Sequence, residues 1–504
     1  MNSAADHLTR PGDPHHGRRR WYAVLAILLT GTALYFGSGL ATIPALTWLA
    51  PLPVFLLAGR ISARSAAVTA FAGWTLGLAN LWHYLLKDLE LPPPALSFLL
   101  LLAGVFTLTA LLFRALVIRR RFILAALAAP ACWAACDFLI ATVSPHGAFT
   151  SLAYTQAEVR PVIQVVSLTG PWGISFLLML PAAVLAALLA PGVRRRMVLQ
   201  LSAVFTVVAL GIFGYGAWRL SDTPTAHQPV RIAVVSANTE DDSNWTTPGG
   251  PAILANYSRA IVEAARQGAE IVLLPEKIID VQASALAGLS DSFQKLATSN
   301  NVEIAVGLTV FADQGNDYNR AIVFRPDGGA PTEYDKHHLI PGLEPYAVGD
   351  HLGLMDGSAG ERWGVLICKD LDFPPLSRQY GKAGVDLLLV PALDFDNDGW
   401  LHSRMALLRG IENGIPIARN GSKGRLTLTD QHGRITSELS APSNDSVTML
   451  GELTPGIART PYTRWGDWFA YLCILLTATG LAGAVRSRSL LRRNAVDSSA
   501  PRVI

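Results

Sequence analysis

The chain has 504 residues, of which 51% are hydrophobic and only 16% are charged, and its formal net charge is +3. Soluble domains usually carry about 25% charged residues, so this composition excludes an ordinary soluble protein. The deficit is local, because residues 21–220 contain almost no acids whereas residues 221–465 have the composition of a globular domain with its own core. The basic excess lies in short clusters beside apolar runs, which favours membrane topology signals over nucleic-acid binding.

Eight apolar runs predict a polytopic α-helical membrane protein. They cover approximately Trp21–Gly37, Leu40–Leu57, Ala66–Leu85, Ala95–Leu116, Phe122–Val143, Val162–Leu189, Met197–Trp218 and Trp468–Val485. Most of them approach the roughly 20 residues that a helix needs to cross a bilayer. Pro44, Pro51 and Pro53 interrupt the second run. We therefore expect about eight transmembrane helices, seven within residues 21–220 and a closing one within residues 466–486.

The basic residues predict the orientation of these helices. One set of loops holds Arg18–Arg20, Arg60, Arg64, Arg119–Arg121, Arg194–Arg196, Arg486, Arg488, Arg492 and Arg493, whereas the alternate loops hold little beyond Lys87 and Arg160. Because basic loops stay in the cytoplasm, segments 1–20 and 487–504 are expected inside and residues 221–465 outside. The first run lacks a small-residue cleavage site, which favours a retained anchor over a signal peptide.

Three of the four cysteines, Cys132, Cys136 and Cys473, fall within apolar runs, so a disulfide framework is not expected. The pair Cys132 and Cys136 is read as small residues in helix packing rather than as a metal pair. Cys368 is different, because it lies in the polar block that is expected to face an oxidising compartment. An unpaired thiol there calls for a reason, and catalysis supplies one.

Residues 221–465 alternate between strand and helix patterns, which predicts an α/β layered fold. Strands are expected at Val230–Ala237, Ile271–Leu274, Ile304–Phe311, Tyr318–Phe324, Trp363–Cys368, Leu387–Val390, Leu426–Thr429 and Thr436–Leu439. Helices are expected at Ile253–Gln267, Ser284–Ser299, Leu376–Ala383 and Trp400–Asn413. The segments Arg325–Gly328 and Asp430–Gly433 are typical of hairpin turns.

Glu276, Lys336 and Cys368 each stand at or just beyond an expected strand. A thiol attacks a carbonyl only as the thiolate, a neighbouring glutamate can take its proton, and a lysine ammonium can stabilise the oxyanion that forms. Each residue alone also has a structural interpretation: a helix-capping acid, a solvated charge and a small buried residue. Their occurrence together favours acyl transfer through a thioester.

The motifs Leu273–Glu276, Tyr334–Pro341 and Leu366–Cys368 resemble those of the nitrilase, or carbon–nitrogen hydrolase, superfamily. The whole chain resembles the apolipoprotein N-acyltransferase family, membrane enzymes with a nitrilase-like αββα sandwich outside the bilayer. In this resemblance Glu344 falls at a second essential acid, and Trp245 falls where the family has a tryptophan near the site. The segments His402–Glu412 and Arg419–Gly424 match a helix and the loop that follows it.

Three departures from the family pattern concern the surroundings of the nucleophile. Lys369 and Asp370 follow Cys368 where the family usually has Tyr-Glu, and the segments Ala392–Trp400 and Arg419–Gly424 replace two family loops. They leave the identity of the acyl acceptor open more than the acyl-enzyme step. Lys369 is interpreted as a solvent-facing residue whose backbone N–H lines the oxyanion site, with a lowering of the Cys368 pKa as the alternative.

The resemblance implies a two-step reaction in a bacterial inner membrane. Cys368 takes an acyl group from a membrane phospholipid, and the thioester passes it to the α-amine of a diacylglyceryl-cysteine on an apolipoprotein. Leu339, Leu343 and His402 are expected to contact substrate, with the segment Leu339–Val348 framing a hydrophobic mouth that excludes water. A membrane-anchored amidase that uses water, or another amine acceptor, is the alternative, and a non-catalytic scaffold is the least favoured.

No cofactor or metal is expected, since no nucleotide loop or metal-ligand cluster is evident in the sequence. Asp394, Asp396 and Asp398 alternate in the manner of a cation loop but lack the glycine and the distal glutamate of a calcium site. They are interpreted as a solvated loop.

Overall fold

The computed structural model describes residues 14–221, 228–237, 243–357, 360–442, 446–456 and 458–497. The chain forms two compact units. The helical unit comprises Met1–Cys136, Ser175–Ala209 and Ala470–Ile504, and the mixed unit comprises Asp137–Ile174 and Leu210–Phe469. This grouping differs from the expected ranges 21–220 and 221–465, because residues 137–174 pack with the α/β part of the chain. Within the expected terminal segments 1–20 and 487–504, residues 1–13 and 498–504 lie outside the described residues.

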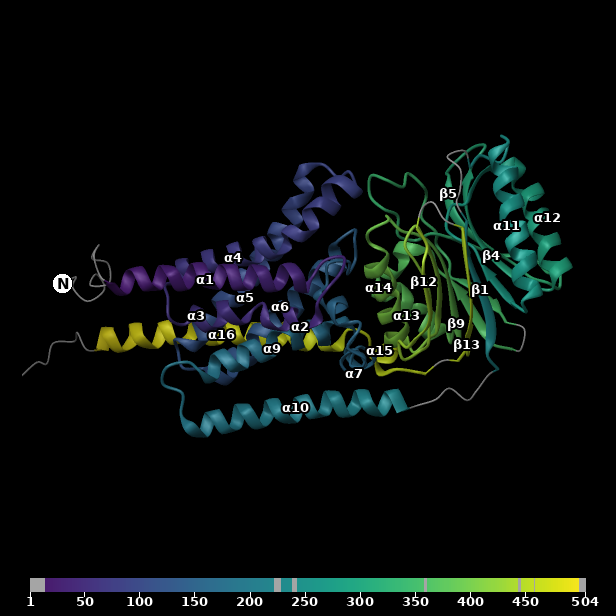
Figure 1. The fold of residues 1–504 in the computed structure, drawn as a ribbon. Helices are drawn as coiled ribbons and strands as arrows, with labels where there is room; N and C mark the ends of the chain where they lie inside the picture. The colour runs from purple at the N-terminus through teal and green to yellow at the C-terminus, as the bar shows by residue number, and fades with distance from the viewer. Residues whose placement is uncertain are drawn as a thin grey trace, which may run out of the picture. The chain divides into compact units, whose positions relative to one another are not determined.

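Long apolar helices dominate the first half of the chain and its end (Figure 1). The helices are α1 (Pro14–Gly37), α2 (Pro44–Leu49), α3 (Leu52–Ala58), α4 (Ala63–Leu78), α5 (Ser97–Val117), α6 (Phe122–Val143), α7 (Arg160–Ile163), α8 (Val166–Thr169), α9 (Pro171–Leu188), α10 (Arg195–Ser221) and α16 (Trp468–Asp497). Short 3₁₀ or π turns occupy Ala79–Leu81, Tyr84–Asp88, Pro93–Leu96 and Leu152–Gln156.

Six of these helical segments in the described part of the chain are long and apolar enough to cross a membrane: Arg18–Gly37, Pro93–Val117, Phe122–Val143, Pro171–Leu188, Arg195–Ser221 and Trp468–Val485. The expected count of about eight is therefore not confirmed. Proline divides the run Leu40–Leu57 into α2 and α3. The run Ala66–Leu85 stops being α-helical at Leu78, and Gly170, with φ +63°, separates α8 from α9.

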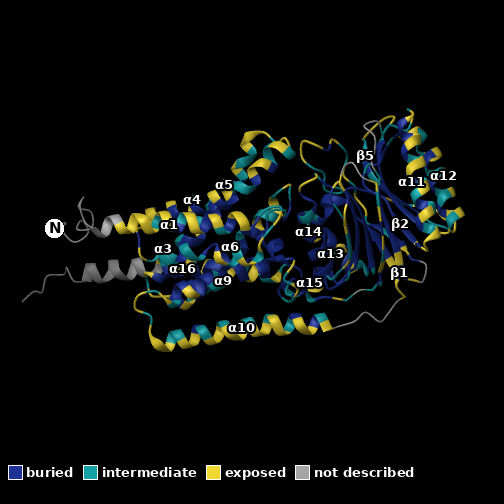
Figure 2. Ribbon diagram, viewed as in Figure 1, coloured by how far each residue is buried: buried dark blue, intermediate teal, exposed yellow. Residues whose placement is uncertain are grey.

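The surfaces of these helices are apolar where they are exposed. In α10, Leu199, Val207, Leu210 and Phe213 are all more than half exposed, and Figure 2 shows exposed residues along most of this helix. Apolar surface on this scale needs a hydrocarbon environment or a partner. Several segments of the chain are thus suited to membrane insertion.

Small residues allow close helix packing in the helical unit. A side chain at Gly77 of α4 would put its Cβ 2.5 Å from Cβ of Leu34 in α1, and one at Gly31 would lie 2.6 Å from Leu76. Such close approach of backbones is typical of membrane helices, which gain mainly dispersion energy from packing. The α1–α4 pair therefore depends on its glycines.

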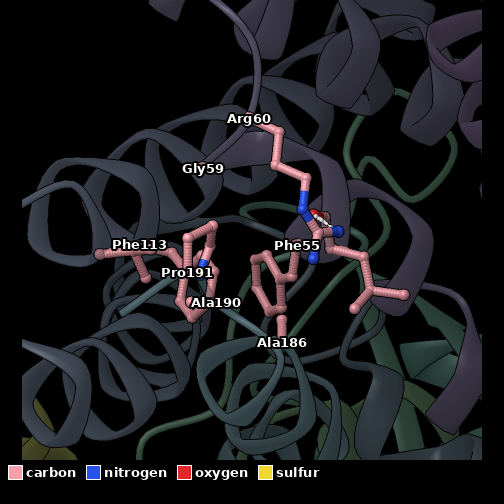
Figure 3. A pocket seen from close by; sticks show the side chains of 9 residues that line it. Phe55, Gly59, Arg60, Phe113, Ala186, Ala190 and Pro191 are labelled. Carbon is pink, nitrogen blue, oxygen red and sulfur yellow. Dashed lines mark hydrogen bonds between the residues drawn. The ribbon is translucent and has the colours of Figure 1, made fainter. Parts of the chain in front are cut away.

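A small pocket lies at the ends of α3, α5 and α9, lined by Phe55, Leu56, Gly59, Arg60, Phe113, Val117, Ala186, Ala190 and Pro191 (Figure 3). Arg60 donates hydrogen bonds to the carbonyl oxygens of Leu56 (2.8 Å) and Leu189 (2.9 Å). Phe55 stacks on Phe113 with ring centroids 4.8 Å apart. Arg60 thus satisfies the carbonyls that a helix end leaves without an intrahelical partner.

The mixed unit contains two β-sheets packed face to face between helices, an αββα sandwich (Figure 1). The first sheet runs in the order β13 (Val447–Leu453), β1 (Val230–Ser236), β2 (Ile271–Leu273), β4 (Glu303–Phe311), β5 (Tyr318–Phe324) and β6 (Thr332–Asp335), with β3 (Ile279–Gln282) paired to β4. The second runs β12 (Ile435–Ser440), β11 (Arg425–Thr429), β10 (Ile417–Ser422), β9 (Leu387–Leu393), β8 (Arg362–Val365) and β7 (Gly353–Asp356).

Helices cover the outer faces of both sheets. α11 (Gly249–Arg266) and α12 (Ala283–Asn300) bury an apolar cluster against the first sheet. α13 (Pro374–Ala383) and α14 (Gly399–Asn413) lie on the side of the second sheet, and the short α15 (Pro461–Trp465) follows (Figure 1). The second large cluster fills the space between the sheets and includes Val234, Leu273, Val365 and Leu389. The predicted αββα sandwich is confirmed.

Most expected strands and helices of this unit are present within one to three residues of their predicted bounds. The prediction omitted β3, β6, β7, β10 and β13, and the Cys368 strand ends earlier than expected, at Val365. The hairpin β11–β12 is not the last element of the sheets, because β13 follows and pairs antiparallel with β1.

Asn420 of β10 joins the two sheets. Its fully buried side-chain amide donates to the carbonyl oxygens of Val235 (2.8 Å) in the first sheet and of Leu273 (2.7 Å) at the end of β2. Ser236 and Ser422 form a second link, with hydroxyl oxygens 2.8 Å apart. Replacement of a buried donor leaves its acceptors unsatisfied.

We expect Asn420→Ala to lower the free energy of unfolding of the mixed unit by about 2–4 kcal/mol, because two buried carbonyls lose their donor. Chemical unfolding of the detergent-solubilised chain checks this value. Asn300→Ala, which removes one partly buried amide at the end of α12, serves as the matched control. Equal stability of the two variants would contradict a role for Asn420 in joining the sheets.

Candidate active site

Cys368 lies on a sharp turn directly after β8. Leu366 still donates to Leu389 of β9 (3.1 Å), Ile367 is extended, and Cys368 has φ +41° at the start of the turn Cys368–Asp372. A left-handed backbone is costly for a residue with a Cβ and persists only where surrounding contacts enforce it. This geometry lifts the thiol out of the sheet, and Sγ lies 3.7 Å from the carbonyl oxygen of Leu393.

Asp370 holds this turn in place. Its carboxylate accepts hydrogen bonds from the N–H of Ile367 (3.1 Å), from the hydroxyl of Tyr334 (2.8 Å) and from the N–H of His338 (2.9 Å). Asp370 is fully buried. Because Tyr334 and His338 flank Lys336, one carboxylate ties the segment of the nucleophile to the segment of the lysine.

Lys336 follows β6 and is buried between two carboxylates. Its Nζ lies 2.8 Å from Oε1 of Glu276 and 2.9 Å from Oε2 of Glu344, and all three side chains are at most 2% exposed. Glu276 follows β2, where Gly307 of β4 leaves room for it, since a Cβ there would lie 2.5 Å from Cα of Glu276. The structure thus brings together three of the residues named from sequence.

Further hydrogen bonds fix the two glutamates. Asn319 of β5 donates through Nδ2 to Glu276 (2.7 Å) and to Glu344 (3.0 Å), and Lys277 lies 3.1 Å from Glu344. The second oxygen of Glu276 accepts from the N–H of Leu393 (3.0 Å), the residue whose carbonyl faces Cys368. Asn319 and Lys277 were not identified from sequence, and only their positions beside a strand end and a candidate glutamate could have drawn attention to them.

Burial and neighbouring charges set the protonation of these groups. Burial raises the pKa of the Cys368 thiol well above its ordinary value, and the charge of Glu276 adds to this, while Lys336 and Arg419 oppose it. Burial lowers the pKa of Lys336, but Glu276, Cys368 and Glu344 outweigh it and raise the pKa. Burial raises the pKa of Glu344, yet Lys336 and Lys277 bring it down to about 2. The resting site therefore holds a neutral thiol beside a charged lysine and Glu344 carboxylate.

This arrangement can carry out nucleophilic acyl transfer. A thiol whose pKa is raised needs a base at the moment of attack, and the Glu276 carboxylate is close enough for its charge to act on the sulfur. The ammonium of Lys336 and the Glu276 carboxylate beside it are almost fully buried, and there a charge stabilises an oxyanion more strongly than in water.

Lys369 is buried, so its expected solvent-facing position is wrong. Its Nζ lies 3.2 Å from Oδ2 of Asp372 and 5.7 Å from the ring centre of Phe373. The ion pair joins two residues of the turn that follows Cys368.

The other residues named from sequence lie around the cluster. Leu339 is half-buried and Leu343 is 44% exposed, both in the segment that Ile340 links to Glu344 by a 2.8 Å hydrogen bond. His402 of α14 lies 3.2 Å from Asp398, and this carboxylate, with those of Asp372 and Asp394, outweighs burial and raises the pKa of His402.

Trp245 lies in the loop before α11. It packs against the cluster between the first sheet and helices α11 and α12, whereas Cys368 belongs to the cluster between the sheets.

The loop after β9 is not solvated in the way expected. Asp394 is buried and forms a bidentate pair with Arg419 of β10, and Asp398 is fully buried. Only Asp396 of the three is exposed. Arg419, which lowers the pKa of Cys368, is thereby fixed beside the nucleophile. Among the described residues, no group of three His, Cys, Asp or Glu side chains is placed to hold a metal ion.

Comparisons with known proteins cover both parts of the chain. The carbon-nitrogen hydrolase family model matches residues 231–454, and the model of the apolipoprotein N-acyltransferase N-terminal domain matches residues 26–184. Among solved structures, this chain is similar to Saccharomyces cerevisiae Nit3, a member of branch 10 of the nitrilase superfamily. That match has 19% identity over 46% of this chain and 93% of that chain, with a TM-score of 0.41.

Full-length relatives are similar along most of their sequence. The apolipoprotein N-acyltransferase of Geobacter metallireducens is 26% identical over 92% of this chain and 96% of its own length. That of Haemophilus ducreyi is 25% identical over 84% and 90%, respectively. With both family models matched in order and relatives aligned from end to end, the chain belongs to the apolipoprotein N-acyltransferase family.

Proposed function

We propose that this chain is a membrane acyltransferase that moves a fatty acyl group from a phospholipid to the α-amine of the N-terminal diacylglyceryl-cysteine of apolipoproteins. The observation that carries the proposal is the buried Glu276–Lys336–Glu344 cluster beside the left-handed Cys368. The same chain carries several apolar helices suited to a membrane, where both substrates reside. Glu276, Lys336 and Cys368 are the proposed catalytic residues.

In the first step Glu276 accepts the thiol proton while Sγ of Cys368 attacks the carbonyl carbon of a phospholipid ester. The C–S bond forms, and the carbonyl oxygen becomes an oxyanion that Lys336 and backbone N–H groups stabilise. The oxyanion then collapses, the ester C–O bond breaks, and the leaving alkoxide takes the proton from Glu276. A lysophospholipid departs and Cys368 remains as a thioester.

In the second step the acceptor α-ammonium gives a proton to the Glu276 carboxylate, and its nitrogen attacks the thioester carbonyl. The C–N bond forms, the C–S bond breaks, and the Cys368 thiolate takes up a proton from Glu276. The second proton of the amine leaves to solvent. Glu344 keeps Lys336 oriented throughout, because it binds the same ammonium and remains a carboxylate at neutral pH.

The proposed topology follows the sequence pattern. About eight membrane helices lie in residues 21–220 and 466–486, the ends 1–20 and 487–504 are cytoplasmic, and residues 221–465 face the periplasm. The basic clusters support this orientation. In the tail, the side chains of Arg486, Arg488, Arg492 and Arg493 lie outside the described residues. A periplasmic site meets the outer leaflet, where the acceptor is anchored.

A membrane-anchored amidase that uses water in place of the amine shares the same three residues. Both reactions pass through an acyl thioester, so the fate of the acyl group separates them. The transferase gives an N-acylated lipopeptide, whereas the hydrolase gives free fatty acid.

We expect Cys368→Ala to abolish both the hydroxylamine-sensitive acyl adduct and triacylated lipoprotein, because the nucleophile is lost. Mass spectrometry of the enzyme labelled with an alkyne phospholipid, and of lipoproteins from cells that depend on this chain, checks both. Cys473→Ala, another buried thiol, serves as the control and keeps wild-type yields. Triacylated lipoprotein at wild-type levels with Cys368→Ala would disprove the proposal.

Glu344 should also make stability depend on pH. Its folded pKa of about 2 lies below the ordinary 4.5. It therefore stabilises the fold above pH 4.5, and this contribution disappears as the pH falls toward 2. We expect Glu344→Gln to lower the free energy of unfolding by on the order of 3 kcal/mol at pH 7, with the difference from wild type shrinking as pH falls through that window.

Unfolding midpoints measured from pH 7 downward check this prediction. Asp291→Asn, on the exposed face of α12, is the control and should leave the pH profile unchanged. A constant difference between Glu344→Gln and wild type across the window would contradict the proposed ion pairing.

The segment Leu339–Val348 is proposed to frame an apolar mouth, since Leu343 is 44% and Val348 62% exposed beside the loop that carries Glu344. We expect Leu343→Ser to raise the ratio of free fatty acid to N-acyl lipopeptide several-fold, because water then reaches the thioester more easily. Product analysis by chromatography gives this ratio. Leu450→Ser, equally apolar and 36% exposed on β13, should not change it; an unchanged ratio with Leu343→Ser argues against the mouth.

A further inference from the structure

A second ion pair lies next to the nucleophile and has no part in the reaction as proposed. Nζ of Lys369 is 3.2 Å from Oδ2 of Asp372, with side chains 7% and 2% exposed. An ammonium has three N–H donors, and this is the one hydrogen-bond partner found for Lys369 among the described residues. Oδ1 of Asp372 is buried and accepts no hydrogen bond from the described part of the chain.

Among the described residues, the neighbouring side chains His402 and His146 do not take up the remaining hydrogen-bond positions of Lys369 and Asp372. Nδ1 of His402 is 3.9 Å from Oδ1 of Asp372, beyond hydrogen-bond distance, while its Nε2 is already paired with Asp398. Burial and the charge of Lys369 lower the pKa of His146, so this ring is neutral near pH 7. The pair therefore keeps free donors on Lys369 and a free acceptor on Asp372.

The pair lies in the same short turn as the nucleophile, Cys368–Asp372. Lys369 follows Cys368 directly, and the carbonyl of Asp372 accepts from the N–H of Ala148 (2.9 Å). A Cβ at Gly147 would lie 2.5 Å from that carbonyl oxygen, so the segment before α7 packs tightly here. The half-buried side chains beside the pair are His146 and Phe149, and the latter ring lies 5.8 Å from His402. A ligand reaches the pair by displacing them.

A ligand that completes both groups must present a donor and an acceptor on neighbouring atoms. The N-terminal residue of a peptide does so, with its α-ammonium and its own carbonyl oxygen. A phosphate offers acceptors alone and would be repelled by Asp372. The ethanolamine phosphate of a phospholipid offers both, but its glycerol separates it by several bonds from the ester that reacts. An amine held at Asp372 needs no such span to reach the thioester.

We propose that Lys369 and Asp372 hold the N-terminal residue of the acyl acceptor, with the α-ammonium on Oδ1 of Asp372 and the first carbonyl oxygen on Nζ of Lys369. This inference rests on the proposed function and assigns two positioning residues to its second step. The bonds made and broken in that step are unchanged.

The test measures the two half-reactions separately on the full chain in lipid nanodiscs. We expect Asp372→Asn and Lys369→Met to form the Cys368 thioester from an alkyne phospholipid within about twofold of the wild-type rate. For a diacylglyceryl-cysteinyl peptide we expect each variant to raise KM about tenfold or more, the factor for a loss of about 1.4 kcal/mol. Cleavage of the thioester by hydroxylamine, which needs no positioning, should keep its rate.

A shortened acceptor distinguishes the two contacts. Diacylglyceryl-cysteamine has the amine but lacks the peptide carbonyl. We therefore expect Lys369→Met to leave its KM unchanged and Asp372→Asn to raise it. Equal effects of Lys369→Met on both acceptors would overturn the assignment of the carbonyl to Lys369.

Because a single change leaves a buried charge without its partner, the double variant Lys369→Met/Asp372→Leu removes the pair together. The exposed pair Arg231–Glu452 provides the matched control, Arg231→Met/Glu452→Leu. A folded double variant with wild-type KM for the lipopeptide overturns the proposal. So does slower thioester formation from ethanolamine phospholipid alone, which would assign the pair to the donor head group. Failure of the proposed function looks different, since wild type would then give no N-acylated lipopeptide.

Discussion

The site depends on one buried ammonium shared by two carboxylates. Lys336 between Glu276 and Glu344 is almost without solvent exposure, so neither its charge nor theirs is compensated by water. Removal of any one member would leave a buried charge without a partner, which is far more costly than loss of a surface ion pair. The arrangement is therefore rigid, and its rigidity is useful, because an oxyanion is stabilised best by a charge that does not have to move toward it.

The sandwich fold supplies this rigidity from remote parts of the chain. Glu276 and Lys336 come from strand ends of the first sheet, whereas Cys368 follows β8 of the second. Asn420 and the Ser236–Ser422 contact join the sheets, and Asp370 joins the turn of the nucleophile to the lysine segment. The distance between sulfur and ammonium is thus set by buried polar links across the core, with apolar packing filling the space between the sheets.

Sequence reasoning singled out Glu276 and Cys368 because each is a chemically distinctive residue at the end of an apolar run, a pattern that needs no knowledge of the fold, whereas Lys336 follows the polar strand β6. It could not find Asn319 or the link through Asp370, since an amide within a strand and an acid in a turn acquire meaning only from partners far along the chain. The errors at Lys369, Asp394 and Asp398 have a different origin. Charged residues are usually exposed, and their burial here rests on Asp372, Arg419 and His402.

The helices, too, were predicted in part from the sequence. Hydropathy identified the long apolar runs, but the α-helical length of each run depends on where proline and glycine interrupt the backbone, as at Pro51 and Gly170.

The left-handed backbone of Cys368 restricts which residues fit at this position without strain. Glycine adopts that conformation with the least strain, so a substitution that relaxes the turn would remove the nucleophilic sulfur. At this position the requirement for stability and the requirement for catalysis conflict. The hydrogen bonds of Asp370 hold the turn in place and so allow cysteine to be kept.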